Sequence, residues 1–265
     1  MHEGADRVIP YEVPGLSGLE LWHGLSRGAS LYRLRESKRD YFEALRDFLL
    51  RLHAGTASTE DAHDTENLAR AARFERVLFC GGEALHPLLE EILADTPLPF
   101  CFEIDRIGEF AARRGALRIF REMGWRRGVA LDLGQTQLKV ITASACRMIA
   151  RDPHLLPVGF DSLDPAAGLA RLRDLLRQGL SNAESPMDGV VLALPVALDQ
   201  NGSARPATYP GLSGPVEPLF ADLFRTPWVV LNDAVLAAAG FPPAKHEKTV
   251  VITMGFGLGG ALWEG

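Results

Sequence analysis

The chain has 265 residues and a mass of 28.9 kDa, which is enough for one large domain or two modest ones. Apolar residues make up 47% of it and charged residues 23%, a balance that is typical of globular proteins and excludes a disordered or fibrous chain. The formal net charge of −6 argues against nucleic acid as a partner, because binding to phosphates requires a basic face.

The hydropathy pattern and the spacing of cysteine and histidine residues argue against a membrane protein, a secreted protein and a zinc-binding protein. The sequence contains no uninterrupted apolar run of the roughly 18 residues that a membrane helix needs, and its first residues do not have the pattern of a signal peptide. The cysteines Cys80, Cys101 and Cys146 share no close spacing, and the histidines show no ligand spacing. We therefore expect a cytoplasmic protein without a membrane partner and without zinc.

Helical and β-rich segments alternate along the chain. Apolar residues at steps of three and four predict helices, and short runs rich in β-branched residues predict strands. In chain order the predicted elements are the helix 38–53, the exposed loop 54–67, the strand 76–79, the helix 85–94, the strands 128–133 and 138–144, the helix 168–180, and the strands 189–196, 228–231 and 249–254. This alternation predicts an α/β architecture.

Glycines follow the last of these strands. Gly255, Gly257 and Gly260 satisfy the spacing G-x-G-x-x-G, which in dinucleotide-binding proteins is followed by a helix and a second parallel strand. The residues up to Gly265 leave no room for either element. We therefore predict a hairpin, with Ala261–Trp263 in the returning strand.

A second glycine turn lies between the strands 128–133 and 138–144. The first strand reaches Asp132, and the chain then turns through Gly134, Gln135 and Thr136. Such a turn brings backbone N–H groups close to an anion, Thr136 adds a hydroxyl donor, and Asp132 is suited to hold a hydrated Mg²⁺. An ordinary hairpin with an incidental Asp and Thr explains the same residues.

Two further strand ends carry suggestive residues. Gly81 and Gly82 follow the strand 76–79 and allow close approach of a flat or anionic ligand. Asn232 and Asp233 stand where the strand 228–231 gives way to a small-residue helix. Asp233 is either the N-cap of that helix or a carboxylate that accepts a proton from a substrate hydroxyl.

Together these four signals resemble the ROK family, within the sugar kinase/actin/heat-shock-70 superfamily. The family's phosphate-2 motif is similar to residues 255–261, and its P-v-x-v-x-N-D-A segment is similar to residues 227–234. The phosphate-1 pattern D-x-G-x-T-x-x-K and the glycines of the phosphate-2 motif are matched by Asp132, Gly134, Thr136, Lys139, Gly255, Gly257 and Gly259.

The second half of the family's order stands at the front of this chain. Residues 7–13 resemble the next strand, residues 15–31 a helix start that contains Glu20, residues 41–52 the long helix, and residues 108–120 the closing helix. We therefore predict a circularly permuted protein, which is tolerated where chain ends lie in exposed turns. The permutation predicts that 249–254 and 7–13 are neighbouring strands of one sheet; their separation into different sheets would rule it out.

The resemblance implies two ribonuclease H-like (actin-like ATPase) lobes with a nucleotide cleft. One lobe would comprise 108–248 with a crossing helix at 108–121, and the other 1–107 with 249–265. The implied activity is ATP-dependent, Mg²⁺-assisted phosphoryl transfer to a hydroxyl of a sugar or related small molecule. By resemblance, Asp233 is the base, Asn232 and Glu20 contact the sugar, and Gly81 and Gly82 lie against adenosine. A surface helix glutamate is an equally good interpretation of Glu20.

Some residues depart from the family pattern. Phe256 replaces a threonine of the phosphate-2 motif, the family's zinc segment is absent, and Thr208 replaces an asparagine of the substrate loop. The alternative hypothesis is therefore a catalytically inactive protein that binds a nucleotide or metabolite. A third hypothesis is an actin-like module that binds a partner. The sequence is compatible with a homodimer and does not decide the oligomeric state.

Overall fold

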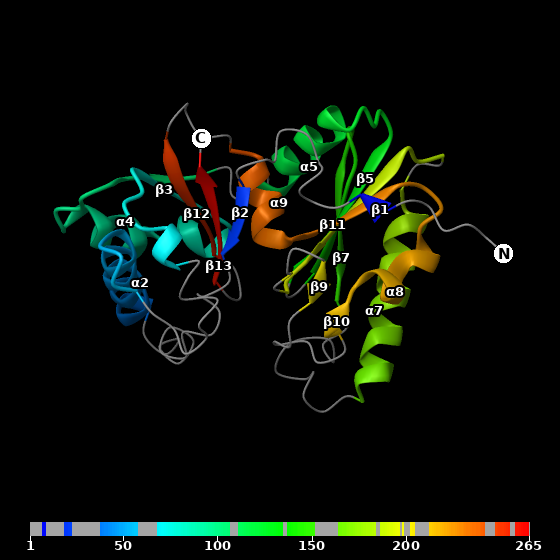
Figure 1. The fold of residues 1–265 in the computed structure, drawn as a ribbon, viewed down its shortest axis with the longest axis horizontal. Helices are drawn as coiled ribbons and strands as arrows, with labels where there is room; N and C mark the ends of the chain where they lie inside the picture. The colour runs from blue at the N-terminus through cyan, green and yellow to red at the C-terminus, as the bar shows by residue number, and fades with distance from the viewer. Residues whose placement is uncertain are drawn as a thin grey trace. The chain divides into compact units, whose positions relative to one another are not determined.

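The computed structural model describes part of the chain, in which helices flank two mixed β-sheets (Figure 1). In this part, no helix is both long enough and apolar enough to cross a membrane. The chain divides into two compact units, Met1–Ser17 with Ala112–Gly240 and Gly18–Ala111 with Phe241–Gly265. The described residues are 7–8, 19–22, 38–57, 68–106, 111–134, 137–151, 164–183, 186–196, 198, 202–204, 212–241, 247–254 and 258–264.

The first unit contains a six-stranded sheet and a short two-stranded ladder. The sheet has the order β1-β11-β8-β5-β6-β7, in which β1, β11, β8 and β5 are parallel and β6 and β7 continue as an antiparallel meander. Every residue of β5, β8 and β11 is buried, as expected for parallel strands that helices cover on both faces. The strands are β1 (Arg7–Val8), β5 (Gly128–Leu133), β6 (Gln137–Ile141), β7 (Cys146–Ala150), β8 (Gly189–Leu194) and β11 (Trp228–Asn232), with β9 (Ser203–Ala204) and β10 (Gly214–Pro215) in the ladder.

Helices of the first unit pack closely on this sheet and on one another. A Cβ atom at Gly179 of α7 would lie within 3.0 Å of the Leu131 and Leu138 side chains, so the glycine lets the helix approach β5 and β6. A Cβ at Gly115 of α5 would lie 1.7 Å from the Leu236 carbonyl oxygen, so α5 and α9 touch backbone to backbone. The helices are α5 (Ala111–Glu122), α7 (Pro165–Ser181), α8 (Glu217–Phe220), the 3-10 turn η7 (Ala221–Leu223) and α9 (Asp233–Ala239).

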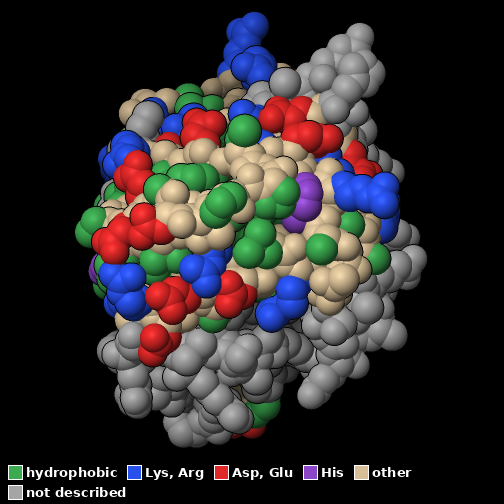
Figure 2. All heavy atoms as spheres, turned by 90° about the vertical axis from the view of Figure 1, so that its left-hand side faces the viewer, with side chains coloured by type: hydrophobic (Ala, Val, Ile, Leu, Met, Phe, Trp, Pro, Cys, Tyr) green, Lys and Arg blue, Asp and Glu red, His purple; other side chains and the backbone are tan. Residues whose placement is uncertain are grey.

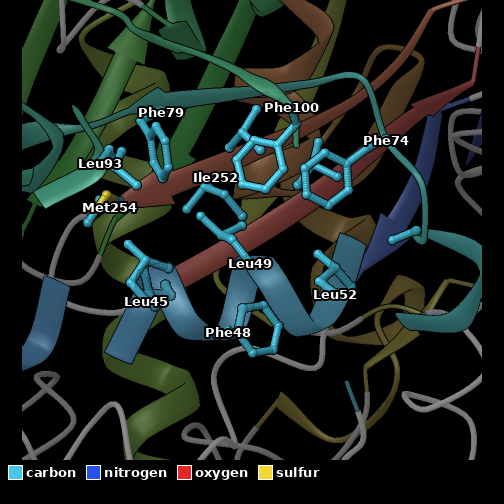
Figure 3. Packing of buried hydrophobic residues seen from close by; sticks show 14 of the residues in the cluster. Leu45, Phe48, Leu49, Leu52, Phe74, Phe79, Leu93, Phe100, Ile252 and Met254 are labelled. Carbon is cyan, nitrogen blue, oxygen red and sulfur yellow. The ribbon is translucent and has the colours of Figure 1, made fainter. Parts of the chain in front are cut away.

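The second unit contains a five-stranded sheet, and its hydrophobic core lies between this sheet and helix α2 (Lys38–His53). The sheet has the order β2-β13-β12-β3-β4. Figure 3 shows Leu45, Leu49 and Leu52 of α2 directed at side chains from the sheet, among them Phe79 and Ile252. The elements are β2 (Leu19–Trp22), α2 (Lys38–His53), β3 (Arg76–Cys80), the 3-10 turn η3 (Gly82–Leu85), α4 (Pro87–Ala94), β4 (Cys101–Ile104), β12 (Lys248–Met254) and β13 (Leu258–Glu264).

The face of the second unit that carries α4 has charged side chains of both signs among uncharged ones (Figure 2). Figure 2 shows lysine and arginine side chains interspersed with aspartate and glutamate side chains on this face. Arg39 of α2 lies 2.6 Å from Glu91, and Arg106 lies 2.7 Å from Glu90. Such exposed ion pairs each contribute little to stability, so the fold rests on the apolar core beneath them.

Both sheets share one arrangement of strands. In the first, the hairpin β5–β6 continues antiparallel into β7, and β8 and β11 lie parallel on the other side of β5. In the second, the hairpin β12–β13 continues antiparallel into β2, and β3 and β4 lie parallel on the other side of β12. Among these five strands of each sheet, the hairpin comes first in the chain in the first unit and last in the second; β1, the sixth strand of the first sheet, precedes the hairpin and has no counterpart in the second sheet.

The central elements agree with the sequence-based predictions. The predicted helix 38–53 is α2, the predicted strand 128–133 is β5, and residues 249–265 contain the predicted hairpin β12–β13. The predicted strand 138–144 ends at Ile141, because Thr142 and Ala145 close a tight turn into β7.

Three predictions in the N-terminal half are wrong. Arg7–Val8 pairs with β11 in the first sheet, whereas 249–254 lies in the second, so the two are not neighbours and the circular permutation, as predicted from residues 7–13, fails its test. Leu19–Trp22 is not a helix start but strand β2, which pairs with β13. Leu85 lies in η3 and is 47% exposed, so it does not belong to the apolar stripe of α4. The pairing of β1 also explains why Met1–Ser17 joins the first unit instead of the second. Residues 9–13, 58–67, 108–110 and 208–211 lie outside the described part.

Candidate functional site

The carboxyl ends of three parallel strands meet at one edge of the first unit's sheet. In register, Asp132 of β5 stands beside Ala193 of β8, and Leu194 of β8 stands beside Asn232 of β11. Neighbouring strands are about 4.8 Å apart, so the ends of β5 and β11 are separated by about 10 Å. The edge therefore brings Asp132 and the Asn232–Asp233 pair into one region.

Asp132 forms a buried ion pair with Lys139. The two residues are directly opposite in the β5–β6 hairpin, so their side chains project from the same face. Lys139 Nζ lies 2.9 Å from Asp132 Oδ2, and the Asp132 side chain is only 5% exposed. Burial alone would lower the pKa of Lys139, but the charge and hydrogen bond of Asp132, together with the charge of Asp233, raise that pKa above its ordinary value. The lysine therefore stays protonated.

Asp233 is the first residue of α9 and carries a strongly shifted carboxyl group. Burial, and then the negative charge of Asp132, raise the pKa of Asp233 to about 7, although Lys139 acts in the opposite direction. One ammonium group thus faces two carboxylates. A carboxyl group that titrates near neutral pH is suited to accept and release a proton.

Asn232, and not Asp233, is the N-cap of α9. Its Oδ1 accepts a hydrogen bond from the Ala234 amide at 2.8 Å. Its Nδ2 donates to the Val196 carbonyl at 2.9 Å, which ties the end of β8 to the start of α9. Both ends of the amide are engaged inside the unit, and this favours a structural role for Asn232 over the expected sugar contact.

The turn of the β5–β6 hairpin is held from two sides at Gly134. The Gly134 amide donates to the Gln137 carbonyl at 2.9 Å, and a Cβ at this position would lie 3.1 Å from that same oxygen. The Gly134 carbonyl accepts a hydrogen bond from Arg151 Nη1 at 2.6 Å. Thr136, the hydroxyl donor expected from the sequence, lies outside the described part.

Arg151 is the residue of this region that the sequence reasoning missed. It directly follows β7, an edge strand of mixed polarity that the hydropathy pattern did not reveal. The arginine is only 5% exposed. The signal that would have found it is an arginine placed directly after a strand that pairs with the β5–β6 hairpin.

The remaining predicted residues belong to the second unit. Gly81 has a φ of +100°, and a Cβ there would lie 2.3 Å from the Met254 carbonyl oxygen, so its glycine is required for packing against β12. Gly82 opens η3 with no atom within 4 Å of a Cβ position. Gly259 lies inside β13, opposite Thr253, and not in the turn. Glu20 lies in β2, where its backbone pairs with Leu262. Gly255 and Gly257 lie outside the described part.

The residues of the first unit fit a divalent cation that arrives with phosphates. Among the described residues no three His, Cys, Asp or Glu side chains gather as an all-protein metal site would require. Mg²⁺ is commonly held by one or two carboxylates together with substrate phosphates and water. Asp132 and Asp233 leave a surplus of negative charge beside the hairpin turn, which such a cation would balance. No protein-family model, no curated protein and no solved structure matches this chain.

Proposed function

We propose that this chain binds MgATP and transfers its terminal phosphoryl group to a hydroxyl of a sugar or related small molecule. The convergence of Asp132, Lys139 and Asp233 at one edge of the first sheet carries the proposal. In the ROK family, which the sequence resembles, the corresponding positions are the phosphate-1 hairpin and the catalytic base.

The strand order of the two sheets supports the accompanying fold hypothesis. The arrangement that five strands of each sheet have in common is what two ribonuclease H-like lobes of an actin-like ATPase would have. The permutation as predicted from residues 7–13 fails, because Arg7–Val8 lies in the first sheet and 249–254 in the second. A different permuted order, in which β2 follows the hairpin β12–β13, is the version that belongs to this proposal.

Asp233 is the residue that would handle the proton. Its carboxylate accepts the proton of the acceptor hydroxyl as the hydroxyl oxygen forms a bond to the terminal phosphorus and the bond to the leaving ADP oxygen breaks. Ala234 N–H holds one oxygen of this carboxylate at 2.9 Å, so the group is oriented before substrate binds. Asp132 would hold Mg²⁺, whose charge offsets that of the phosphate oxygens. Lys139 holds the Asp132 side chain in place through their 2.9 Å hydrogen bond.

Asp233→Asn tests the proposal, because it removes the base and keeps the side-chain shape. ADP release is measured across a panel of sugars and polyols, and binding of a non-hydrolysable ATP analogue with Mg²⁺ is measured beside it. We expect turnover to fall roughly 10²- to 10⁴-fold while nucleotide affinity changes little. Asp188→Asn, at a carboxylate paired with Arg127 on the surface, is the matched control and should keep full turnover.

The alternative of an inactive nucleotide-binding protein is favoured by Phe256, which replaces a threonine of the phosphate-2 motif. It predicts nucleotide binding, no ADP release with any acceptor, and no effect of Asp233→Asn. Turnover that survives Asp233→Asn would contradict the proposed role of this residue.

A further inference from the structure

Strand β7 forms one edge of the first unit's sheet, and no strand of the described part pairs with its outer side. The Thr142 amide donates to the Ala145 carbonyl at 2.8 Å, which sets the alternation of the β6–β7 ladder. Every second pair of an antiparallel ladder is hydrogen-bonded, so Arg147 and Ile149 direct their backbone groups at β6. The backbone N–H and C=O groups of Met148 therefore point outward.

This edge lacks the features that normally prevent a sheet from pairing with another chain. Such features are very short strands, lysines, prolines and bulges. Strand β7 has five residues in a continuous register, it contains no proline, and its one charged residue is Arg147. The Arg147 guanidinium donates to the Asn182 carbonyl at the end of α7 at 3.3 Å, so it is turned toward the helix. At the centre of the strand stands the apolar side chain of Met148, which is 52% exposed.

We propose that β7 pairs with β7 of a second copy of this chain, antiparallel and centred on Met148, so that two sheets become one. In this register Met148 is opposite its own copy, and the two residues exchange both backbone hydrogen bonds. Arg147 is opposite Ile149, so no like charges face each other directly. A twofold contact of this kind uses the same strand of both copies. The inference goes beyond the proposed function and does not depend on it.

Helix α7 leaves room for the second copy. Its Gly179 lies against Leu131, Leu138 and Val140, so the helix packs over β5 and β6. With strands about 4.8 Å apart, the axes of the two α7 helices would be roughly 19 Å apart, which exceeds the helix diameter of about 10–12 Å. The pairing therefore brings no clash between these helices.

Met148→Pro tests the pairing, because it removes an outward N–H group and keeps the hydrogen bonds that Arg147 and Ile149 make to β6. Molar mass is measured by sedimentation equilibrium over a wide range of protein concentration, with urea unfolding beside it. The wild-type chain should reach twice its mass of 28.9 kDa. The variant should have a dissociation constant higher by roughly tenfold or more, because the dimer loses two backbone hydrogen bonds. Met148→Thr, which shortens the same side chain and keeps the N–H group, is the matched control and should remain mainly dimeric.

A disulfide cross-link tests the register and does not depend on how well the proline variant folds. In a Cys101→Ser, Cys146→Ser background, Met148→Cys brings two thiols together at the twofold axis, with Cα atoms about 5.5 Å apart. Arg147→Cys is the matched control, because its copy is a diagonal neighbour about 7–8 Å away, too far for a disulfide. Oxidation should give covalent dimers in the Met148→Cys chain and none in the Arg147→Cys chain.

A wild-type chain that stays at 28.9 kDa at every concentration would overturn the inference. Dimerisation of a folded Met148→Pro chain at wild-type strength, or equal weakening by Met148→Pro and Met148→Thr, would show that the backbone of β7 does not make the contact. Cross-linking that is as strong from residue 147 as from residue 148 would contradict the register. None of these measurements uses nucleotide, so their outcome is independent of the proposed function.

Discussion

Asp132 and Asp233 share a single lysine at the carboxyl edge of the first sheet, and this imbalance determines the chemistry of the region. Lys139 is paired with Asp132 at 2.9 Å. The ionised form of Asp233 is therefore the unfavourable one, because this side chain is buried beside a second carboxylate. A buried carboxyl group in this situation binds a proton or approaches a cation. The same property that suits Asp233 to act as a base also makes its ionisation costly for the folded state.

The raised pKa of Asp233 predicts a loss of stability as the pH rises. Its pKa is about 7 in the folded chain and near its ordinary value of 3.8 in the unfolded chain, so the folded state binds the proton more tightly. Its contribution to the free energy of unfolding therefore falls between pH 4 and pH 7 and is lost above pH 7. At about 1.4 kcal/mol per pKa unit, the loss is at most of the order of a few kcal/mol.

Urea unfolding of the wild-type chain and Asp233→Asn at several pH values between 4 and 8 measures this contribution. The difference in unfolding free energy between the two proteins should shift steadily in favour of the variant as the pH rises. The lowered pKa of Asp188, caused first by its hydrogen bond from Arg127, acts below pH 3.8 and does not enter this window. If the difference in unfolding free energy between the two proteins does not change with pH, the pKa of Asp233 is not raised in the folded chain.

At the scale of single elements, the junction between β3 and η3 depends on Gly81. This residue has a positive φ and leaves no space for a side chain against the Met254 carbonyl, whereas its neighbour Gly82 faces open space. Gly81→Ala combines an unfavourable backbone conformation with a clash against backbone of the central strand β12.

We predict that Gly81→Ala lowers the free energy of unfolding by about 2 kcal/mol or more, and that Gly82→Ala changes it by less than about 1 kcal/mol. Chemical denaturation of the two variants and the wild-type chain provides the comparison. Equal effects at the two positions would contradict the packing of Gly81 against β12.

Buried, periodic elements were predictable from the sequence, and edge elements were not. Helix α2 and strand β5 have unbroken apolar patterns because they form the core of their units. Strands β7 and β4 lie at sheet edges with about half of their side chains exposed, so their hydropathy does not distinguish them from loops. Strand β2 has four residues, too few for a period, and a family resemblance led to its assignment as a helix start.

The candidate site shows the same division. The spacing of Asp132 and Lys139 around a glycine turn predicted a hairpin, and the register of that hairpin places the two side chains directly opposite each other. Arg151 follows β7 and donates a hydrogen bond to the Gly134 carbonyl in the same turn. The sequence motif of the hairpin does not include this arginine, so the motif could not predict the contact. The helix-capping role of Asn232 depends on contacts with the end of β8 that the local sequence does not reveal.

At the scale of the whole molecule, five strands of each unit have the same neighbours in their sheet but follow one another in a different order along the chain. Apart from β1, which pairs with β11 at the edge of the first sheet, the hairpin comes first among the strands of the first sheet and last among those of the second. Strand pairing depends on the hydrophobic faces and not on where the chain begins, so strands can keep the same neighbours while their order along the chain differs. The glycine-bearing hairpins therefore stand at equivalent places of their sheets.

Calorimetric titration with a non-hydrolysable ATP analogue, with and without Mg²⁺, tests the nucleotide-binding claim most directly. We predict binding in the micromolar range that requires Mg²⁺ and that Asp132→Asn weakens, since this aspartate would hold the cation. The absence of binding at millimolar nucleotide, or binding that neither Mg²⁺ nor Asp132→Asn affects, would contradict the proposed role of the β5–β6 hairpin.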